Sequence, residues 1–154
     1  HYAQFAGDGL MALYGLRGGV GRACRDSLRG ALEMHRRLQR LNERLGAELN
    51  EPLRMGIGIH TGEAIVGPMG PPPSPNLSAV GDNINIAARL EQQTKSLECS
   101  LVISAAIAER AQIDLSQFPL HVVPVRGRDA PIEVYAVNDP EQLEALLAAH
   151  ASAA

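Results

Sequence analysis

Several features are scarce in this sequence, and each scarcity argues against a class of protein. Tryptophan is absent and aromatic residues make up 3%, which disfavours binding of single-stranded nucleic acid by base stacking. The formal charge of −3 argues against nucleic-acid binding through bulk positive charge. No apolar run approaches the roughly 18 residues that a membrane-spanning helix needs. We also find no export signal within these residues, because no basic segment followed by an apolar stretch opens the sequence.

Cysteine is also scarce. The two cysteines, Cys24 and Cys99, match no metal-binding or redox spacing and are most simply buried thiols in a reducing compartment. We therefore expect a cytoplasmic protein, whether or not modules outside this sequence tether it to a membrane. With 154 residues, 45% of them apolar and 20% charged, the sequence has the composition of a globular protein and the length of one domain or most of a larger one.

The first elements are indicated by the spacing of apolar residues. Gly7-Asp8-Gly9 separates two β-prone runs, Tyr2–Ala6 and Leu10–Tyr14, and Asp-Gly in that place indicates a hairpin. From about Arg22 to Leu45 apolar residues recur every three or four positions, which predicts a long helix. That helix is long enough to cross a whole sheet.

Strict alternation of side chains begins after Pro52. Residues from Leu53 to His60 alternate, which predicts a strand with one buried face, and Thr61-Gly62 turns it into a second strand over Glu63–Val66. Gly56 and Gly58 leave the other side of the first strand bare, so we expect another part of the chain to pack closely there.

The second half continues in short elements. We expect an irregular proline-rich loop over Gly67–Leu77, a helix from Asp82 or Asn83 to Thr94, a strand over Leu101–Ile103, a short helix capped by Ser104, strands over Leu120–Val125 and Ile132–Val137, and a final helix over Glu141–His150. This order predicts an α+β domain in which helices cover one face of a mostly antiparallel sheet. Residues 1–150 form that single domain, and 151–154 are expected to be a frayed tail.

Four polar positions stand out, although each has an ordinary structural explanation by itself. Asp8 favours a hairpin turn whatever else it does. Asn85 and Arg89 are four apart and share one helix face. Arg126 lies in a glycine turn, where exposed arginines are common. His60 follows a strand within a turn motif and is more simply structural than a metal ligand.

The motifs gain specificity from their order. They are Gly7-Asp8-Gly9-Leu10-Met11-Ala12-Leu13-Tyr14-Gly15, then Gly56–Glu63, then Val80–Glu91, and last Val125–Tyr135. Together these blocks resemble the catalytic domain of class III adenylate and guanylate cyclases, from Tyr2 to about Val137. The resemblance implies a ferredoxin-like domain that forms a head-to-tail homodimer. It also implies a reaction in which the 3′-hydroxyl of a purine nucleoside triphosphate attacks its own α-phosphate, expelling pyrophosphate and closing a 3′,5′-cyclic monophosphate.

The same resemblance assigns roles to residues. Asp8 matches an aspartate that binds metal, in a family that uses two divalent ions, Mg²⁺ or Mn²⁺. Asn85 matches the asparagine that orients the ribose, and Arg89 the arginine that stabilises the transition state at the α-phosphate. Arg126 falls where the family usually has a lysine that binds the terminal phosphates. In the family each site is shared between two protomers.

This sequence departs from the family pattern in three places. Gln4 stands where the family has a base-contacting lysine, and Ser78 where adenylate cyclases have aspartate or threonine. The opening block of the family, a strand with the first metal aspartate followed by two helices, has no counterpart here, so we expect this stretch alone to be inactive. These departures leave an alternative open, a degenerate cyclase-like domain that binds nucleotide or dimerises for regulation.

Overall fold

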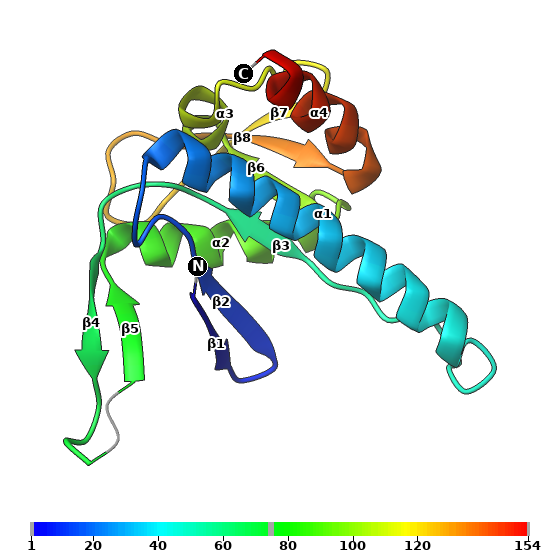
Figure 1. Cartoon of the computed structure of the whole chain (residues 1–154), viewed down its shortest axis with the longest axis horizontal. Coiled ribbons are helices and arrows are strands. Elements are labelled where there is room, and N and C mark those ends of the chain that lie inside the picture. Colours follow the sequence, from blue (N-terminus) through cyan, green and yellow to red (C-terminus); the bar gives the residue numbers. More distant parts are fainter. Residues whose placement is uncertain (1, 74–75, 154) are drawn as a thin grey trace.

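The computed structural model describes residues 2–73 and 76–153 (Figure 1). Its elements in order are β1 (Tyr2–Ala6), β2 (Gly9–Leu13), α1 (Val20–Leu45), β3 (Ile57–Ile59), β4 (Ile65–Met69), β5 (Asn76–Val80), α2 (Asp82–Ser96), β6 (Leu101–Ser104), α3 (Ala105–Ala111), β7 (Leu120–Val123), β8 (Ile132–Val137), the 3₁₀ turn η1 (Pro140–Gln142) and α4 (Leu143–Ala153). Ala154, part of the expected tail, lies outside the described residues. Over the described part of the chain, no helix is both long and apolar enough to cross a bilayer.

A four-stranded sheet in the order β3-β6-β8-β7 forms the centre of the molecule. Strands β3 and β6 are parallel, whereas β8 is antiparallel to both β6 and β7. All four residues of β6 are buried. A strand that is apolar on both sides needs cover on both sides, and this decides where the helices go.

The helices cover both faces of this sheet, so the expectation that they cover one face is wrong. Leu101 and Ile103 join the core formed with α1, α3 and α4. Val102, which lies between them and points the other way, joins a second core with Ile86 and Leu90 of α2. In the view of Figure 1, the long α1 lies above β3 and the green α2 lies below it. The α+β class that the sequence predicts is confirmed.

Two hairpins stand apart from the central sheet. Strands β1 and β2 pair antiparallel in the predicted place, with Phe5 opposite Leu10. The second predicted hairpin is wrong, because β3 pairs with β6 while β4 pairs with β5. Strands β4 and β5 therefore occupy much of the region predicted as an irregular loop. Pro68 lacks a backbone donor, but a two-stranded sheet leaves each strand one unpaired edge where that lack is tolerated.

The strand predicted over Leu53–His60 is shorter than expected. Only Ile57–Ile59 pairs as β3, and Leu53 and Met55 are 43% and 37% exposed. The side chain of Asn42 on α1 explains the late start, because its amide donates to the Leu53 carbonyl at 2.9 Å and accepts from the Leu53 N–H at 2.8 Å. The Leu53 N–H and carbonyl thus pair with a helix side chain, which takes the place of a strand neighbour at this residue.

The close packing expected at Gly56 and Gly58 is confirmed, and α2 is the element that packs there. A Cβ on Gly58 would overlap the backbone of Ala87, Leu90 and Glu91, and a Cβ on Gly56 would overlap the side chain of Thr94. Because Gly58 has no side chain, the backbone of α2 packs directly against β3, and Gly56, just before the strand, leaves room for the Thr94 side chain.

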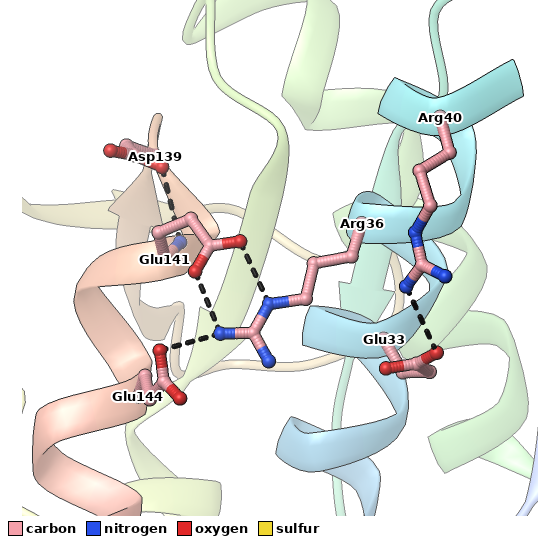
Figure 2. A network of polar contacts seen from close by, with 6 residues as sticks. All are labelled: Glu33, Arg36, Arg40, Asp139, Glu141 and Glu144. Atoms are coloured by element: carbon pink, nitrogen blue, oxygen red, sulfur yellow. Dashed lines mark hydrogen bonds and ion pairs between the residues drawn. The ribbon is translucent and has the colours of Figure 1, made fainter. Parts of the chain in front are cut away.

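On the opposite face, an ion-pair network joins α1 to the C-terminal helix (Figure 2). Arg36 donates from Nε and Nη2 to the two carboxylate oxygens of Glu141, at 2.8 Å each, and from Nη2 to Glu144 at 2.6 Å. The Arg36 guanidinium holds the pKa of Glu141 below its usual range. The Glu141 backbone N–H donates to the Asp139 carboxylate at 3.1 Å, which caps η1. The fork geometry fixes the direction of α1 relative to the start of α4.

The contact at Gly58 predicts a large effect of a small substitution. Gly58→Ala should lower the free energy of unfolding by about 1–3 kcal/mol, because the added methyl meets backbone that cannot rotate away. Gly67→Ala on β4 is the matched control, since nothing lies within 4 Å of a Cβ there. Urea denaturation of both variants measures the difference. Equal stability of Gly58→Ala and the unmodified chain would contradict the described packing.

Candidate functional site

Asp8 lies at the tip of the β1–β2 hairpin. It is exposed, and the preceding Gly7 has a φ of +64°, a conformation that favours glycine. The two paired strands hold the tip in place, while nothing covers the carboxylate. This position suits both a turn-forming aspartate and a carboxylate that binds an external cation.

Asn85 and Arg89 lie one turn apart on α2, and both are exposed. Their neighbours Ile86 and Leu90 are 1% and 0% exposed and belong to the core. The i,i+4 spacing therefore does put the amide and the guanidinium on one outward face. The helix beneath them is fixed by its buried stripe and by its contact with Gly58.

The other three predicted residues are spread over three elements. Gln4 lies on β1 opposite Met11, and its Oε1 atom is enclosed without a hydrogen-bond partner. Ser78 lies half-buried on β5, opposite Gly67. Arg126 is exposed in the turn between β7 and β8, where Gly127 has a φ of +82°.

The structure shows no polar bond among these six side chains. Within residues 2–73 and 76–153, no hydrogen bond or ion pair joins any two of them. Figure 1 shows both hairpins projecting below α2 in this view, β1–β2 towards the middle and β4–β5 at the left. A groove of about 420 Å³ lies where the β4–β5 hairpin meets the start of α2, and it is lined by Glu63, Ala64, Ile65, Val80 and Gly81.

The described residues do not form a metal site by themselves. They contain no group of three or more His, Cys, Asp or Glu side chains placed to hold an ion. Asp8 thus belongs to no such group among the described residues, and two divalent ions would need ligands beyond it.

The two cysteines are free thiols, as expected from their spacing. Cys24 is buried and Cys99 is half-buried. Burial raises the pKa of both thiols, which disfavours the thiolate form of each.

His60 takes part in a polar network that sequence reasoning did not identify. Its Nδ1 lies 2.8 Å from the Ser104 hydroxyl and its Nε2 lies 2.9 Å from the Asn83 Oδ1. The Asn83 amide in turn donates to the Glu63 carbonyl at 2.8 Å. Ser104 occupies the N-cap of α3, but its side chain makes no cap bond there. The sequence held a signal at Asn83, a polar residue in the first turn after Gly81, although its partners are distant along the chain.

Burial of His60 predicts a pH dependence of stability. Burial lowers its pKa below the ordinary 6.5, and the positive charge of Arg128 adds to that effect, although the bond to Asn83 opposes it. The unfolded chain therefore binds a proton at this residue more readily than the folded chain does. The free energy of unfolding should fall as the pH drops below about 6.5, and this loss should be smaller in His60→Gln. Urea denaturation at pH 7.5 and 5.5 tests this, and equal losses in both chains would contradict it.

Comparison with known proteins places this arrangement in a family. A sequence model of the adenylate and guanylate cyclase catalytic domain matches residues 4–139. Adenylate cyclase 1 of Rhizobium meliloti is 32% identical over 135 residues, covering 87% of this chain and 20% of that protein. The adenylate cyclase of Anabaena cylindrica is 28% identical over 143 residues, covering 88% of this chain and 27% of that protein. This chain thus spans about a fifth to a quarter of the length of these relatives.

Solved structures agree with the sequence match. The guanylyl cyclase Cya2 superimposes with a TM-score of 0.74 at 28% identity, covering 87% of this chain and 67% of that one. The adenylyl cyclase CyaB from P. aeruginosa has a TM-score of 0.72 at 22% identity, covering 89% of this chain and 70% of that one, and supports the fold alone. The family match spans most of the chain and its blocks fall on the hairpin, β3 and α2 described above. This chain belongs to the adenylate and guanylate cyclase catalytic domain family.

Proposed function

We propose that this domain is the catalytic part of a purine nucleotide cyclase that converts ATP, with GTP as a second substrate, into the 3′,5′-cyclic monophosphate and pyrophosphate. The observation that carries the proposal is the pair Asn85 and Arg89, exposed together on one face of a helix whose other face is locked into the core. A rigid helix can hold an amide and a guanidinium at a fixed separation, which is what the reaction requires.

Arg89 has the chemistry to stabilise the transition state. When the 3′-hydroxyl oxygen attacks the α-phosphorus, negative charge gathers on the equatorial oxygens and on the leaving pyrophosphate. A guanidinium presents several donors in one plane and keeps its charge at any working pH. Arg89 is exposed and forms no ion pair with another described residue, so its donors are available to a ligand.

Asn85 and Arg126 take supporting roles. The Asn85 amide can both donate to and accept from ribose oxygens, which fixes the sugar so that its 3′-oxygen faces the phosphorus. Arg126, exposed in its turn, can pair with the terminal phosphates and neutralise the leaving group.

Gln4 and Ser78 are the proposed contacts to the base. Gln4 Oε1 is buried without a partner, and a buried acceptor left unpaired costs free energy that the amide would recover by turning towards a donor on a ligand. The amino group of adenine is such a donor. Because an amide and a hydroxyl both donate and accept, they can also meet a guanine edge, which favours loose selection between the two bases.

We propose that the complete site forms between two copies of this domain, with Asp8 from one copy and Asn85 and Arg89 from the other. Support comes from the placement of Asp8 on a projecting hairpin without a bond to either α2 residue. In a twofold dimer the same two surfaces meet twice, which gives two equivalent sites. Divalent ions, Mg²⁺ or Mn²⁺, would supply charge neutralisation near Asp8 and would need further ligands, because the described residues of one chain hold no group of three or more His, Cys, Asp or Glu side chains placed to bind an ion.

A degenerate domain that binds nucleotide or only dimerises is the second candidate. Gln4 in place of the family lysine favours it, as does the absence among the described residues of a three-ligand group that includes Asp8. The two candidates differ in one measurable respect, since only the first makes cyclic nucleotide.

Mixing two inactive variants tests both the activity and the shared site. In the complete native chain, Asp8→Asn and Arg89→Ala should each abolish most turnover of ATP. Equal amounts co-expressed should recover about a quarter of the wild-type activity, because half of the dimers are mixed and each holds one intact site of its two. No recovery in dimers shown to be mixed would contradict the shared site, and no turnover by the wild-type chain would favour the degenerate domain.

Arg89→Ala also distinguishes stabilisation of the transition state from binding of the substrate in its ground state. If the guanidinium acts mainly on charge that develops during the reaction, kcat should fall on the order of 10²-fold while KM changes little. Steady-state kinetics of the complete native chain with ATP measure both constants. Lys95→Ala, at an exposed position in the last turn of the same helix, is the control. A rise in KM without loss of kcat would instead assign Arg89 to ground-state binding.

A further inference from the structure

The polar network around His60 joins four segments that are far apart in sequence. His60 follows β3, Ser104 ends β6, Asn83 lies in the first turn of α2, and Glu63 precedes β4. Ser104 is fully buried, while His60 and Asn83 are half-buried. A network in this position connects the end of the central sheet to the start of the helix that carries Asn85 and Arg89.

The hydrogen-bond inventory fixes the tautomer of the ring. The Glu63 carbonyl can only accept, so the Asn83 Nδ2 donates to it and the Asn83 Oδ1 is left as an acceptor. His60 Nε2 must therefore carry the proton that it shares with Asn83, and His60 Nδ1 accepts from the Ser104 hydroxyl. Neutral imidazole with the proton on Nε2 satisfies every partner at once, which agrees with the lowered pKa of His60.

Gly62 holds the Asn83 side chain from a second side. A Cβ on Gly62 would overlap the Asn83 amide group, so the amide occupies space that only glycine leaves open. The Asn83 side chain is thus enclosed between the His60 ring, the Glu63 carbonyl and Gly62.

Among the described residues, no other side chain anchors the first turn of α2 through hydrogen bonds of this kind. Its N-cap is Gly81, which has a φ of +140° and provides no side chain to cap the helix. The only backbone bonds into this turn from the cap are those from the Ile84 and Asn85 N–H groups to the Gly81 carbonyl, at 3.1 and 3.4 Å. Farther along, Leu90 and the contact with Gly58 hold the helix. Ile86, buried one residue after Asn85, fixes the helix on its apolar side, and Asn83 is the side chain that ties the residues before it to the rest of the fold.

We infer that His60 is a positioning residue for the cyclase reaction, which acts through Asn83 to fix the orientation of the first turn of α2 and thereby aims Asn85. This inference rests on the proposed function for its catalytic part. Two residues along a helix rotate the side chain by about 200°, so Asn83 points into the molecule while Asn85 points out. A rotation of the turn that breaks the bond to His60 moves Asn85 by the same angle.

Substitution in the complete native chain tests the inference. His60→Leu removes both ring bonds and Gly62→Ala displaces the Asn83 amide without touching the ring. Both should lower kcat about tenfold or more with KM within about threefold of wild type, because small displacements of a positioning group cost rate more than affinity. His60→Gln keeps a donor that can reach Asn83 and should recover most of the rate. Gly46→Ala, at the end of α1, is the control, because a Cβ there makes only ordinary contacts.

Hydrogen–deuterium exchange supplies a readout that does not depend on activity. In His60→Leu and Gly62→Ala, the amides of Ile84 and Asn85 should exchange faster, while those in the last turn of α2 keep the wild-type rate. Gly62→Ala keeps the test available if His60→Leu fails to fold. Wild-type exchange and wild-type kcat in a folded Gly62→Ala chain would overturn the inference. If the wild-type chain makes no cyclic nucleotide, the proposed function fails, yet faster first-turn exchange would still support the link and unchanged exchange would overturn it.

Discussion

The direct contact between α2 and β3 is the constraint on which the candidate site depends. Because Gly58 has no side chain, the backbone of α2 rests on the strand, and Ile86 and Leu90 enter the core on either side of that contact. Once those side chains are buried, the 100° step between residues decides which face of the helix each other residue lies on, and the bond between Asn83 and His60 holds the first turn. Asn85 and Arg89 are exposed together for that reason and not because of any contact of their own.

The two faces of the sheet have different roles. The face covered by α1, α3 and α4 holds the larger hydrophobic core, and the fork of Arg36 with Glu141 and Glu144 joins its first and last helices. The other face holds a smaller core beneath α2. Since β6 is buried on both sides, its side chains pack into both cores, and the strand fixes the position of one core relative to the other. A rigid scaffold on one face thus supports a helix on the other face whose outward side is free for ligands.

Sequence patterns predicted those features that depend on neighbours along the chain. Spacing of four placed Asn85 and Arg89 on one face, Asp-Gly marked the hairpin that carries Asp8, and the bare glycines of β3 indicated a close neighbour. Contacts between distant residues were not predictable in this way. The parallel pairing of β3 with β6 and the hold of Asn42 on Leu53 decide where β3 begins and which strand it meets. The partners of His60 at Asn83 and Ser104 are likewise 23 and 44 residues away.

The proline-rich segment shows a second limit of sequence patterns. Five prolines around residue 70 are typical of an irregular loop, but strands β4 and β5 form on either side of the turn and pair with each other. In a two-stranded sheet each strand has an unpaired edge, so the missing N–H of Pro68 costs little there, whereas the same residue would disrupt a central strand. The proline content therefore predicted a loop where part of the chain forms a two-stranded sheet. The consequence reaches the candidate site, because the pairing of β4 with β5 places the backbone of Ser78, the residue after the predicted loop, in a defined register opposite Gly67.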